Sequence, residues 1–236
     1  MHFWSGAGYT AVAVGATTKK LAGVGFVVAL AGVLIGFYIS GYLVGNTKPF
    51  HPSVQAGATP SVNLTLETVA AVGPTLAPHP DWVSYLIRGK GGTWQRSTVW
   101  RLPANALVHV TIYNFDGASG LRNPLFGRPT GLVGPELVDG KPLVAMPPDQ
   151  PSHTFAVPAF GVLVPIAPVQ DDEKNQCGYA PCDLSMAHHT ITFTFRTGKP
   201  GHYRWQCFVP CAAGFVYGFG GPMQTIGYMD GFLDVV

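Results

Sequence analysis

The feature that most constrains this chain is a run of 25 uncharged residues, 21–45, close to its N-terminus. At about 1.5 Å of rise per residue, a helix of this length exceeds the roughly 30 Å of hydrocarbon in a membrane. Lys19 and Lys20 precede the run, whereas only Lys48 follows it closely. Because positive residues favour the cytoplasmic side, this asymmetry predicts one transmembrane helix at 21–45 with a cytoplasmic N-terminus.

A cleaved signal peptide is the alternative for this run. Its apolar region usually spans about 7–15 residues and ends at an Ala-x-Ala-like site, which does not follow Gly45. These differences favour a single-pass anchor in the cell membrane. Gly32 and Gly36, like Gly41 and Gly45, have a spacing that lets a second helix approach closely, so we expect a protein partner besides membrane lipid. Residues 1–20 are expected to form a cytoplasmic or interfacial segment.

The rest of the chain is expected on the outer face of the membrane, and its composition excludes one class of partner. Charged residues make up 11% of the chain, against roughly 25% in an ordinary soluble domain. The formal net charge is +2, and no run of Lys or Arg occurs. A nucleic-acid-binding surface needs such a basic patch, so no nucleic-acid partner is predicted.

Short apolar runs follow a linker at 46–60, and they alternate with a period of two. This alternation is typical of half-buried strands, and frequent Gly and Pro residues separate the runs. The sequence therefore predicts an all-β sandwich or barrel over residues 61–236. The residues that share a face in each run are Val62, Leu64 and Leu66; Val108, Val110 and Ile112; and Ile191, Phe193 and Phe195.

The four cysteines, Cys177, Cys182, Cys207 and Cys211, all lie in the last quarter of the chain. Disulfides persist outside the cell, but cysteines paired this closely also suit metal ligation. The cysteine count leaves both possibilities open. No Gly-x-Ser-x-Gly or His-Glu-x-x-His pattern occurs, so no hydrolytic site and no catalytic residue are predicted in this chain.

Three motifs occur in a fixed order in the outer domain. A His-Thr-Phe-Ala-Val-Pro run at 153–158 is followed by Pro-Gly-His-Tyr at 200–203 and by Cys-x-x-x-Cys at 207–211. Together they resemble the cupredoxin domain of subunit II of haem-copper terminal oxidases, in the form with a single membrane helix. The resemblance covers roughly residues 99–236 with large gaps, and it implies a cupredoxin-like Greek-key β-sandwich.

The family motif binds a dinuclear copper centre, CuA, in which two thiolates bridge two copper ions that each take one imidazole. Carried over to this chain, His153 is the first imidazole, Cys207 and Cys211 are the thiolates, and the Val209 carbonyl is a weak ligand. Soft sulfur and imidazole ligands suit copper. This ligand set is what the resemblance implies if copper is retained.

The second imidazole of the family motif is missing. Counted directly from Cys211, its position is Phe215, and that of the thioether is Gly218. An alignment on the closing strand, 232–236, instead makes Met229 the thioether and puts Ile226 in place of the imidazole. It needs eleven extra residues after Cys211, and we prefer it because it keeps the last strand. In both alignments the second histidine is absent.

Other histidines are poor substitutes for the missing one. His202 lies on the same extended run as Cys207, five residues earlier, and should face the opposite way. His188 and His189 would reach the site only if their loop folds back. The two main alternatives are an altered copper site and a Cys207–Cys211 disulfide with no copper in this chain. A disulfide between Cys177 and Cys182 is expected to close a local loop.

Three insertions distinguish the chain from the family, at 117–152, 170–187 and 212–225. Two of them, 117–152 and 212–225, would emerge at the copper pole, close to the catalytic subunit in the family. Long ordered loops there usually serve function or assembly. We therefore expect subunit I, which carries haem and copper, to be contacted by the membrane helix and by these loops.

Three functions follow from these observations. The first is a subunit II of a respiratory terminal oxidase that has lost CuA and supports a quinol-fed enzyme structurally. The second is an electron-entry subunit with a modified copper centre that accepts electrons from cytochrome c or a blue copper protein. The third is a free-standing, anchored cupredoxin that binds copper. In the first two the chain is part of an oxidoreductase complex without independent catalysis.

Overall fold

The computed structural model describes residues 10–39, 48–71, 82–120, 122–211 and 221–236. They belong to two units, Met1–Gly45 and Asn46–Val236. In the first, helix α1 spans Thr10–Tyr38 and so begins before the predicted segment at 21–45. Within it, Lys19–Tyr38 is long and apolar enough to cross a membrane, and its side chains are exposed. Exposed apolar side chains along a helix of this length are expected of a membrane anchor.

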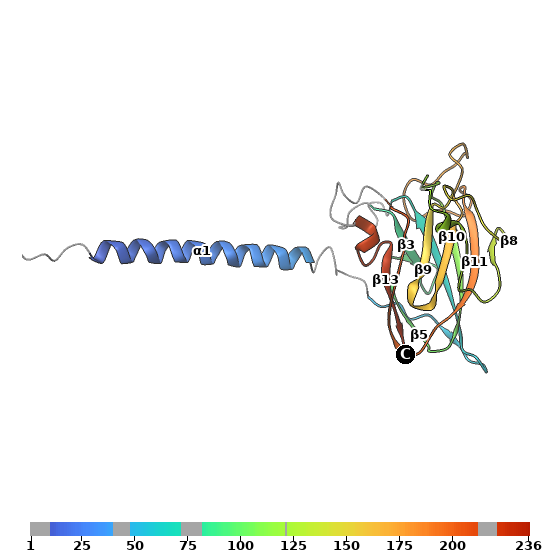
Figure 1. The fold of residues 1–236 in the computed structure, drawn as a ribbon, viewed down its shortest axis with the longest axis horizontal. Helices are drawn as coiled ribbons and strands as arrows, with labels where there is room; N and C mark the ends of the chain where they lie inside the picture. Colours follow the sequence, from blue (N-terminus) through green and yellow to red (C-terminus); the bar gives the residue numbers. More distant parts are fainter. Residues whose placement is uncertain (1–9, 40–47, 72–81, 121, 212–220) are drawn as a thin grey trace, which may run out of the picture. The chain divides into compact units, whose positions relative to one another are not determined.

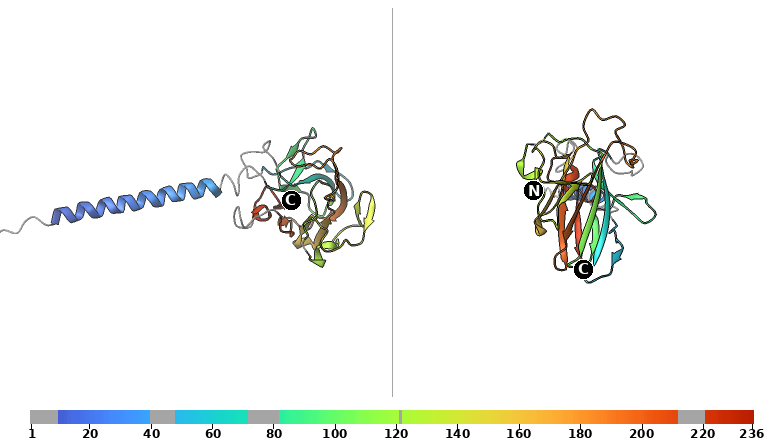
Figure 2. Two further views of the ribbon diagram at one scale, coloured as in Figure 1. Left: turned by 90° about the horizontal axis from the view of Figure 1, so that it is seen from above. Right: turned by 90° about the vertical axis from the view of Figure 1, so that its right-hand side faces the viewer.

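The second unit is a sandwich of two β-sheets (Figure 1, Figure 2). An eight-stranded sheet has the order β4-β3-β2-β6-β11-β7-β8, with β1 paired to β2. A five-stranded sheet has the order β10-β9-β12-β13-β5. The strands are β1 (Val54–Gln55), β2 (Ser61–Val69), β3 (Ser84–Arg88), β4 (Trp94–Gln95), β5 (Val99–Leu102), β6 (Leu107–Asn114), β7 (Glu136–Val138), β8 (Lys141–Leu143), β9 (His153–Val157), β10 (Val162–Ile166), β11 (His189–Arg196), β12 (Gly201–Gln206) and β13 (Asp230–Val235).

The strand connections confirm the predicted fold class. The pairs β2–β6 and β5–β13 are parallel, whereas the other neighbours in the two sheets are antiparallel. A parallel pair needs a long crossover, and here the crossovers carry the chain between the sheets. Short 3-10 turns at Pro124–Gly127, Pro158–Phe160 and Gly221–Gln224 complete the described elements. The domain is a β-sandwich of two mostly antiparallel sheets, as the sequence predicts.

The core forms where the sequence predicts it. The three alternating runs lie on β2, β6 and β11, which are neighbours in one sheet, and each of their nine apolar residues is at most 4% exposed. Aromatic rings of the other sheet face them, with Trp100 stacked on Trp205 at a centroid distance of 4.7 Å. Because apolar burial is the main stabilising contribution to folding, this layer fixes how the sheets stack.

Two segments differ from the sequence prediction. The structure attaches the predicted linker at 46–60 to the sandwich from Phe50 onward: the Phe50 N–H donates to the Val99 carbonyl at 2.8 Å, and β1 pairs with β2. The insertion at 117–152 is ordered and supplies β7 and β8, which extend the larger sheet past β11. Of the insertion at 212–225, residues 212–220 lie outside the described part.

Candidate metal centre

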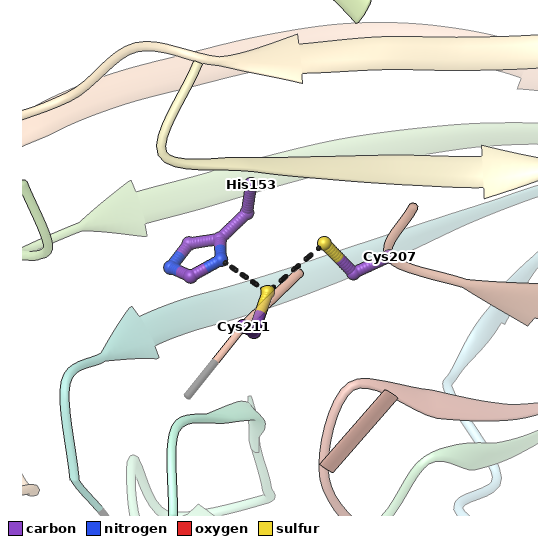
Figure 3. Close-up of side chains that lie close together, drawn as sticks. All are labelled: His153, Cys207 and Cys211. Carbon is purple, nitrogen blue, oxygen red and sulfur yellow. Dashed lines mark hydrogen bonds between the residues drawn. The ribbon is translucent and has the colours of Figure 1, made fainter. Parts of the chain in front are cut away.

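Three side chains predicted as copper ligands converge at one end of the sandwich (Figure 3). His153 is the first residue of β9, Cys207 directly follows β12, and Cys211 lies in the loop beyond it. The Nδ1 atom of His153 is 3.1 Å from the Cys211 sulfur, which is 3.2 Å from the Cys207 sulfur. All three ligand atoms lie within 4.8 Å of one another, and the side chains are buried.

Local strand pairing explains this convergence. β9 and β12 are antiparallel neighbours in the smaller sheet, and Gln206 pairs with Ala156. Because the strands run antiparallel, the residues that follow Gln206 run alongside β9 toward its first residue, His153. The Cys207 sulfur accepts from the Thr154 N–H at 3.3 Å, and the Thr154 hydroxyl accepts from the Phe208 N–H at 2.8 Å. These bonds attach the first turn of the cysteine loop to the strand that carries His153.

Asp116 holds the imidazole from the other side. Its Oδ2 atom is 2.9 Å from Nε2 of His153, and its Oδ1 accepts from the Gly117 N–H at 2.8 Å. Burial disfavours the carboxylate, but the hydrogen bond and charge of His153 hold the pKa of Asp116 below its ordinary value. With Nε2–H directed at Asp116, Nδ1 is the nitrogen left to bind a metal. Carboxylate–histidine pairs of this kind fix the tautomer and ring orientation of metal ligands.

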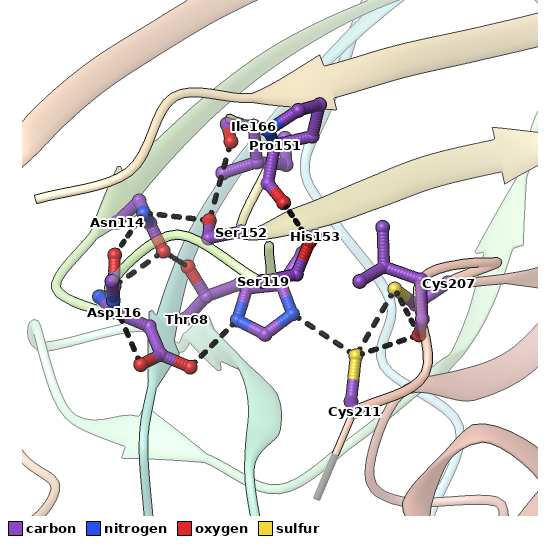
Figure 4. A network of polar contacts seen from close by, with 12 residues as sticks. Thr68, Asn114, Asp116, Ser119, Pro151, Ser152, His153, Ile166, Cys207 and Cys211 are labelled. Carbon is purple, nitrogen blue, oxygen red and sulfur yellow. Dashed lines mark hydrogen bonds and ion pairs between the residues drawn. The ribbon is translucent and has the colours of Figure 1, made fainter. Parts of the chain in front are cut away.

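Asn114 in turn positions Asp116 (Figure 4). It is fully buried at the end of β6, and its Nδ2 atom lies 2.9 Å from the Asp116 carbonyl, 3.0 Å from the Ser152 hydroxyl and 2.7 Å from the Ala167 carbonyl. Its Oδ1 accepts from the Thr68 hydroxyl. One amide therefore joins the segments before and after the insertion at 117–152. The residue preceding His153 is fixed as a result.

The sulfur atoms share further contacts. The Val209 carbonyl lies 3.0 Å from the Cys211 sulfur and 3.4 Å from the Cys207 sulfur, so it faces both predicted thiolate ligands. The Met223 thioether lies 3.0 Å from the Cys211 N–H. Met229, the predicted thioether ligand, contacts the site through its backbone, because its carbonyl accepts from the Cys207 N–H at 2.9 Å. Its sulfur as a ligand stays a prediction.

The protonation of the metal-free site follows from these neighbours. Burial alone would lower the pKa of His153, but its negative partners Asp116 and Cys207 raise it to about 9. Burial would raise the pKa of the Cys207 thiol, yet Cys211 and His153 hold it well below its ordinary value. Its hydrogen bond with Cys207 and its burial raise the pKa of Cys211. The site therefore favours an imidazolium between a thiolate and a carboxylate, from which a soft cation displaces a proton.

The two cysteine pairs differ in their bonding. Cys177 and Cys182 form the predicted disulfide. The alternative disulfide between Cys207 and Cys211 is absent, because their sulfurs are 3.2 Å apart and a disulfide bond measures about 2.05 Å. The two sulfurs lie next to His153 and the Val209 carbonyl and are not within bonding distance of each other.

The remaining histidines considered from the sequence lie away from the centre. His202 faces Asp234 on the exposed side of the sheet, as its strand position predicts. His188 packs against the rings of Tyr113 and Phe115. His189 as a replacement ligand is contradicted: its Nδ1 atom is 2.6 Å from Asp139, because β11 turns this residue toward the β7–β8 hairpin. The positions Phe215 and Gly218 lie outside the described residues.

The donor set fits copper. Two cysteine sulfurs and one imidazole nitrogen form a soft trigonal group, and the Val209 carbonyl lies beside it as a weak donor. A cavity of about 470 Å³ opens at this group. It gives a small cation a route to His153 and Cys211, and its lining includes Asp116, Ser119, Ser152, Asp171 and Gln176.

Two residues of the site and two buried carboxyls of the domain were not predicted from the sequence. Asp116 and Met223 contact the predicted ligands. Glu67 and Glu136 are fully buried, and the carboxyl oxygens of Glu136 make no hydrogen bond within the described part of the chain. The burial of the Glu136 side chain could not be predicted from the sequence, because the insertion that carries it has no strand-like alternation. For Asp116, the signal was its place at the end of the strand that precedes the insertion.

No protein-family model and no curated protein matches the chain. Solved structures match the chain only at low sequence identity and low TM-score, as three of them illustrate. The metal-binding domain of the Cu(I)-exporting P-type ATPase CopA of Streptococcus pneumoniae D39, solved with Cu(I), has a TM-score of 0.33 and 10% identity over 81% of this chain and 99% of that chain. Rusticyanin from Thiobacillus ferrooxidans has a TM-score of 0.31 and 20% identity over 78% of this chain and 87% of that chain. A chain of a haem-copper terminal oxidase dimer has a TM-score of 0.30 and 11% identity over 94% of this chain and 99% of that chain. Likenesses at this level assign no function.

Proposed function

We propose that the chain is the membrane-anchored subunit II of a haem-copper terminal oxidase and that its outer domain holds one copper ion. The observation that carries the proposal is the buried group of His153, Cys207 and Cys211, whose sulfurs are unbonded and lie next to Nδ1. Copper in such a set of soft ligands transfers single electrons. The proposal therefore favours the electron-entry function over a subunit without copper.

The residues around this group have separate tasks. His153 supplies Nδ1, while Asp116 keeps the other ring nitrogen protonated and the ring in place. Cys207 and Cys211 supply sulfur and give up their protons when the ion binds. The Val209 carbonyl lies where a weak additional donor is needed, and the Met223 thioether holds the cysteine loop by accepting the Cys211 N–H. Because this geometry exists before binding, little reorganisation is required of the protein.

A single ion agrees better with the residues than a pair. A dinuclear centre of the CuA type takes one imidazole for each copper, and this chain has no histidine beyond His202. Only His153 therefore remains to serve the two thiolates. One imidazole and two thiolates make a complete trigonal set for one ion. Zinc would prefer four strong ligands in a tetrahedron, which this group does not supply.

The assignment to an oxidase complex rests on the order of the sequence motifs and on the anchor. Lys19–Tyr38 can span the membrane, and Gly32 and Gly36 allow a second helix to approach closely. With the N-terminus in the cytoplasm, the copper domain lies on the outer face. There it would receive electrons from cytochrome c or a blue copper protein and pass them to the haem-bearing subunit I.

Purification of the tagged, full-length chain from native membranes tests the proposal. We expect a haem-bearing membrane subunit to co-purify in stoichiometric amount. Copper in the complex should fall by one ion per chain in Cys211→Ser, while the copper of the partner is unaffected. Equal copper in the wild type and the variant would instead support the structural, quinol-fed subunit. Copper binding without a haem-bearing partner would support the free-standing cupredoxin.

A further inference from the structure

Glu136 is a carboxyl group in the core of the sandwich. It begins β7, in the insertion at 117–152, and is 0% exposed. In the register with β11, Leu137 pairs with Thr192, so Glu136 comes level with the core residue Phe193. Neither of its carboxyl oxygens makes a hydrogen bond with any residue that the structure describes. A buried carboxylate without a partner is costly, so this position favours the protonated, neutral acid.

Tyr85 links Glu136 to the metal centre. Its ring is fully buried on β3, its hydroxyl donates to the Thr154 carbonyl at 3.2 Å, and its centroid is 6.4 Å from that of His153. After burial, the groups that raise the pKa of Tyr85 are Cys207, Cys211 and Glu136. These three groups therefore act on the same phenol ring in the same dry interior. A change of charge at the sulfurs is felt at Glu136 with little screening.

We propose that Glu136 is a redox-linked proton-binding group of this domain, which binds one proton when the centre gains one electron and releases it when the electron leaves. The inference rests on the proposed function. The electron comes from the donor protein and the proton from solvent. One O–H bond forms on the carboxylate, and no other covalent bond changes. The domain would thus couple electron entry to proton uptake on the outer face.

Electrostatics gives the direction of the coupling. The oxidised centre carries one more positive charge than the reduced centre and therefore stabilises the carboxylate form of Glu136. Reduction removes this stabilisation, and the proton is bound more tightly. Burial raises the pKa of Glu136 to about 9 in the metal-free protein, so both forms are accessible in solution. Exchange of the proton needs only local opening of the short edge strands β7 and β8.

The other titratable groups around the centre do not mimic this behaviour. His153, Cys207 and Cys211 are held by the ion. The pKa of Asp116 is lowered, mainly by its contact with His153 against the effect of burial, so it stays ionised near pH 9. The pKa of Tyr85 is raised well above its ordinary value, so it stays neutral. Glu67 is as buried as Glu136, but its charged neighbour is Arg88, which makes it a matched control.

The test is the reduction potential of the copper-loaded, full-length protein in detergent, measured as a function of pH. For the wild type, we expect the potential to fall with rising pH over the range in which Glu136 titrates, with a slope approaching one proton per electron. Glu136→Gln should lose this slope, and Glu67→Gln should retain it. A wild-type potential independent of pH, or a slope that persists in Glu136→Gln, would overturn the proposal.

Infrared difference spectra provide a second readout that does not depend on a variant folding. Reduction should produce the carbonyl band of a protonated carboxylic acid, and the band should shift in D2O. Its absence from the wild type overturns the inference. A protein that binds no copper fails at the loading step, before any potential is measured, and so refutes the proposed function itself. The two failures are therefore distinguishable.

Discussion

The two cysteine pairs of this domain have nearly the same spacing but opposite chemistry. Cys177 and Cys182 are five positions apart and bonded, whereas Cys207 and Cys211 are four apart and free. Both pairs are buried. The difference lies in their neighbours. The first pair has the Tyr179 carbonyl beside its sulfurs, whereas the second has an imidazole as well as a carbonyl.

Each pair is therefore suited to a different purpose. The bonded pair closes the loop at 170–187, which packs with Val69, Leu86 and Phe115 on the outer side of the larger sheet. The free pair lies between the sheets, where strand pairing directs both sulfurs toward His153. Spacing along the chain does not decide whether two cysteines bind each other or a metal. The groups that the fold places beside them do.

The largest expected effect is the loss of copper when a ligand of the free pair is removed. His153→Ala and Cys211→Ser should weaken copper binding by more than the roughly 10–100-fold cost of losing a supporting residue. The measurement is copper bound per chain after dialysis, followed by competition with a Cu(I) chelator. The variant Cys177→Ser/Cys182→Ser is the control and should keep its copper. If the control variant lost as much copper as the ligand variants, the two cysteine pairs would not differ in metal binding.

The free energy of unfolding should depend on pH because of two buried carboxyl groups, Glu67 and Glu136. Burial raises the pKa of Glu67, near Cys182, to about 8 and that of Glu136 to about 9, from 4.5 in the unfolded chain. Between these values the folded protein holds protons that the unfolded chain has released. Stability is therefore highest below pH 4.5 and falls as pH rises, by about 1.4 kcal/mol per pH unit for each group.

Urea unfolding of the full-length protein, followed by tryptophan fluorescence at pH 5 and 6, measures this slope. The interval lies below the range in which His153, with its pKa raised from 6.5 to about 9, adds its own loss of stability. Glu67→Gln and Glu136→Gln should each remove about half of the slope. A free energy of unfolding that does not fall over this interval would show that the two carboxyls are ionised in the folded protein.

Asp116 offers a finer test of the free pair. Asp116→Asn should lower copper affinity about 10–100-fold, because the amide no longer fixes the imidazole tautomer through a charge-assisted bond. The matched control is Asp139→Asn, since Asp139 contacts His189 in a similar ion pair on the surface. That variant should bind copper as the wild type does. Chelator titration of both variants decides the matter, and equal affinities would show that Asp116 has no supporting role.

The smallest expected effect concerns the bonded pair. Replacing Cys177 and Cys182 by Ala should destabilise the domain by about 2 kcal/mol, the chain-entropy value for a loop this short. For a domain of this size, Tm should fall by about 4–8 °C. Calorimetry of the oxidised wild type and the double variant measures the change. An unchanged Tm would mean that packing alone holds the loop.

Much of the fold was predictable because burial leaves a period of two in the sequence. The runs at Val62, Val108 and Ile191 became adjacent strands with their apolar residues inside. The insertion at 117–152 was predictable only as a loop, since β7 is held in the sheet by β11, far along the chain, and β8 only by β7. No local pattern distinguishes Glu136, which faces the core, from an exposed carboxylate.

The candidate site was predictable as far as its motifs reach. His153, Cys207 and Cys211 stand in runs whose order implied their convergence, and the structure brings them together. The state of the thiols was not predictable, because it depends on the angle between β9 and the cysteine loop. Nor was Met223, since the sequence favoured Met229 and only the turn at Gly221–Gln224 brings the Met223 sulfur to Cys211.

X-ray absorption at the copper edge of the purified, full-length protein tests the central claim most directly, because it identifies and counts the atoms around the ion. We expect one copper per chain with two sulfur neighbours and one imidazole nitrogen, and no second copper nearby. A protein without copper whose Cys207 and Cys211 are joined, or a centre with a clear copper–copper signal, would contradict it.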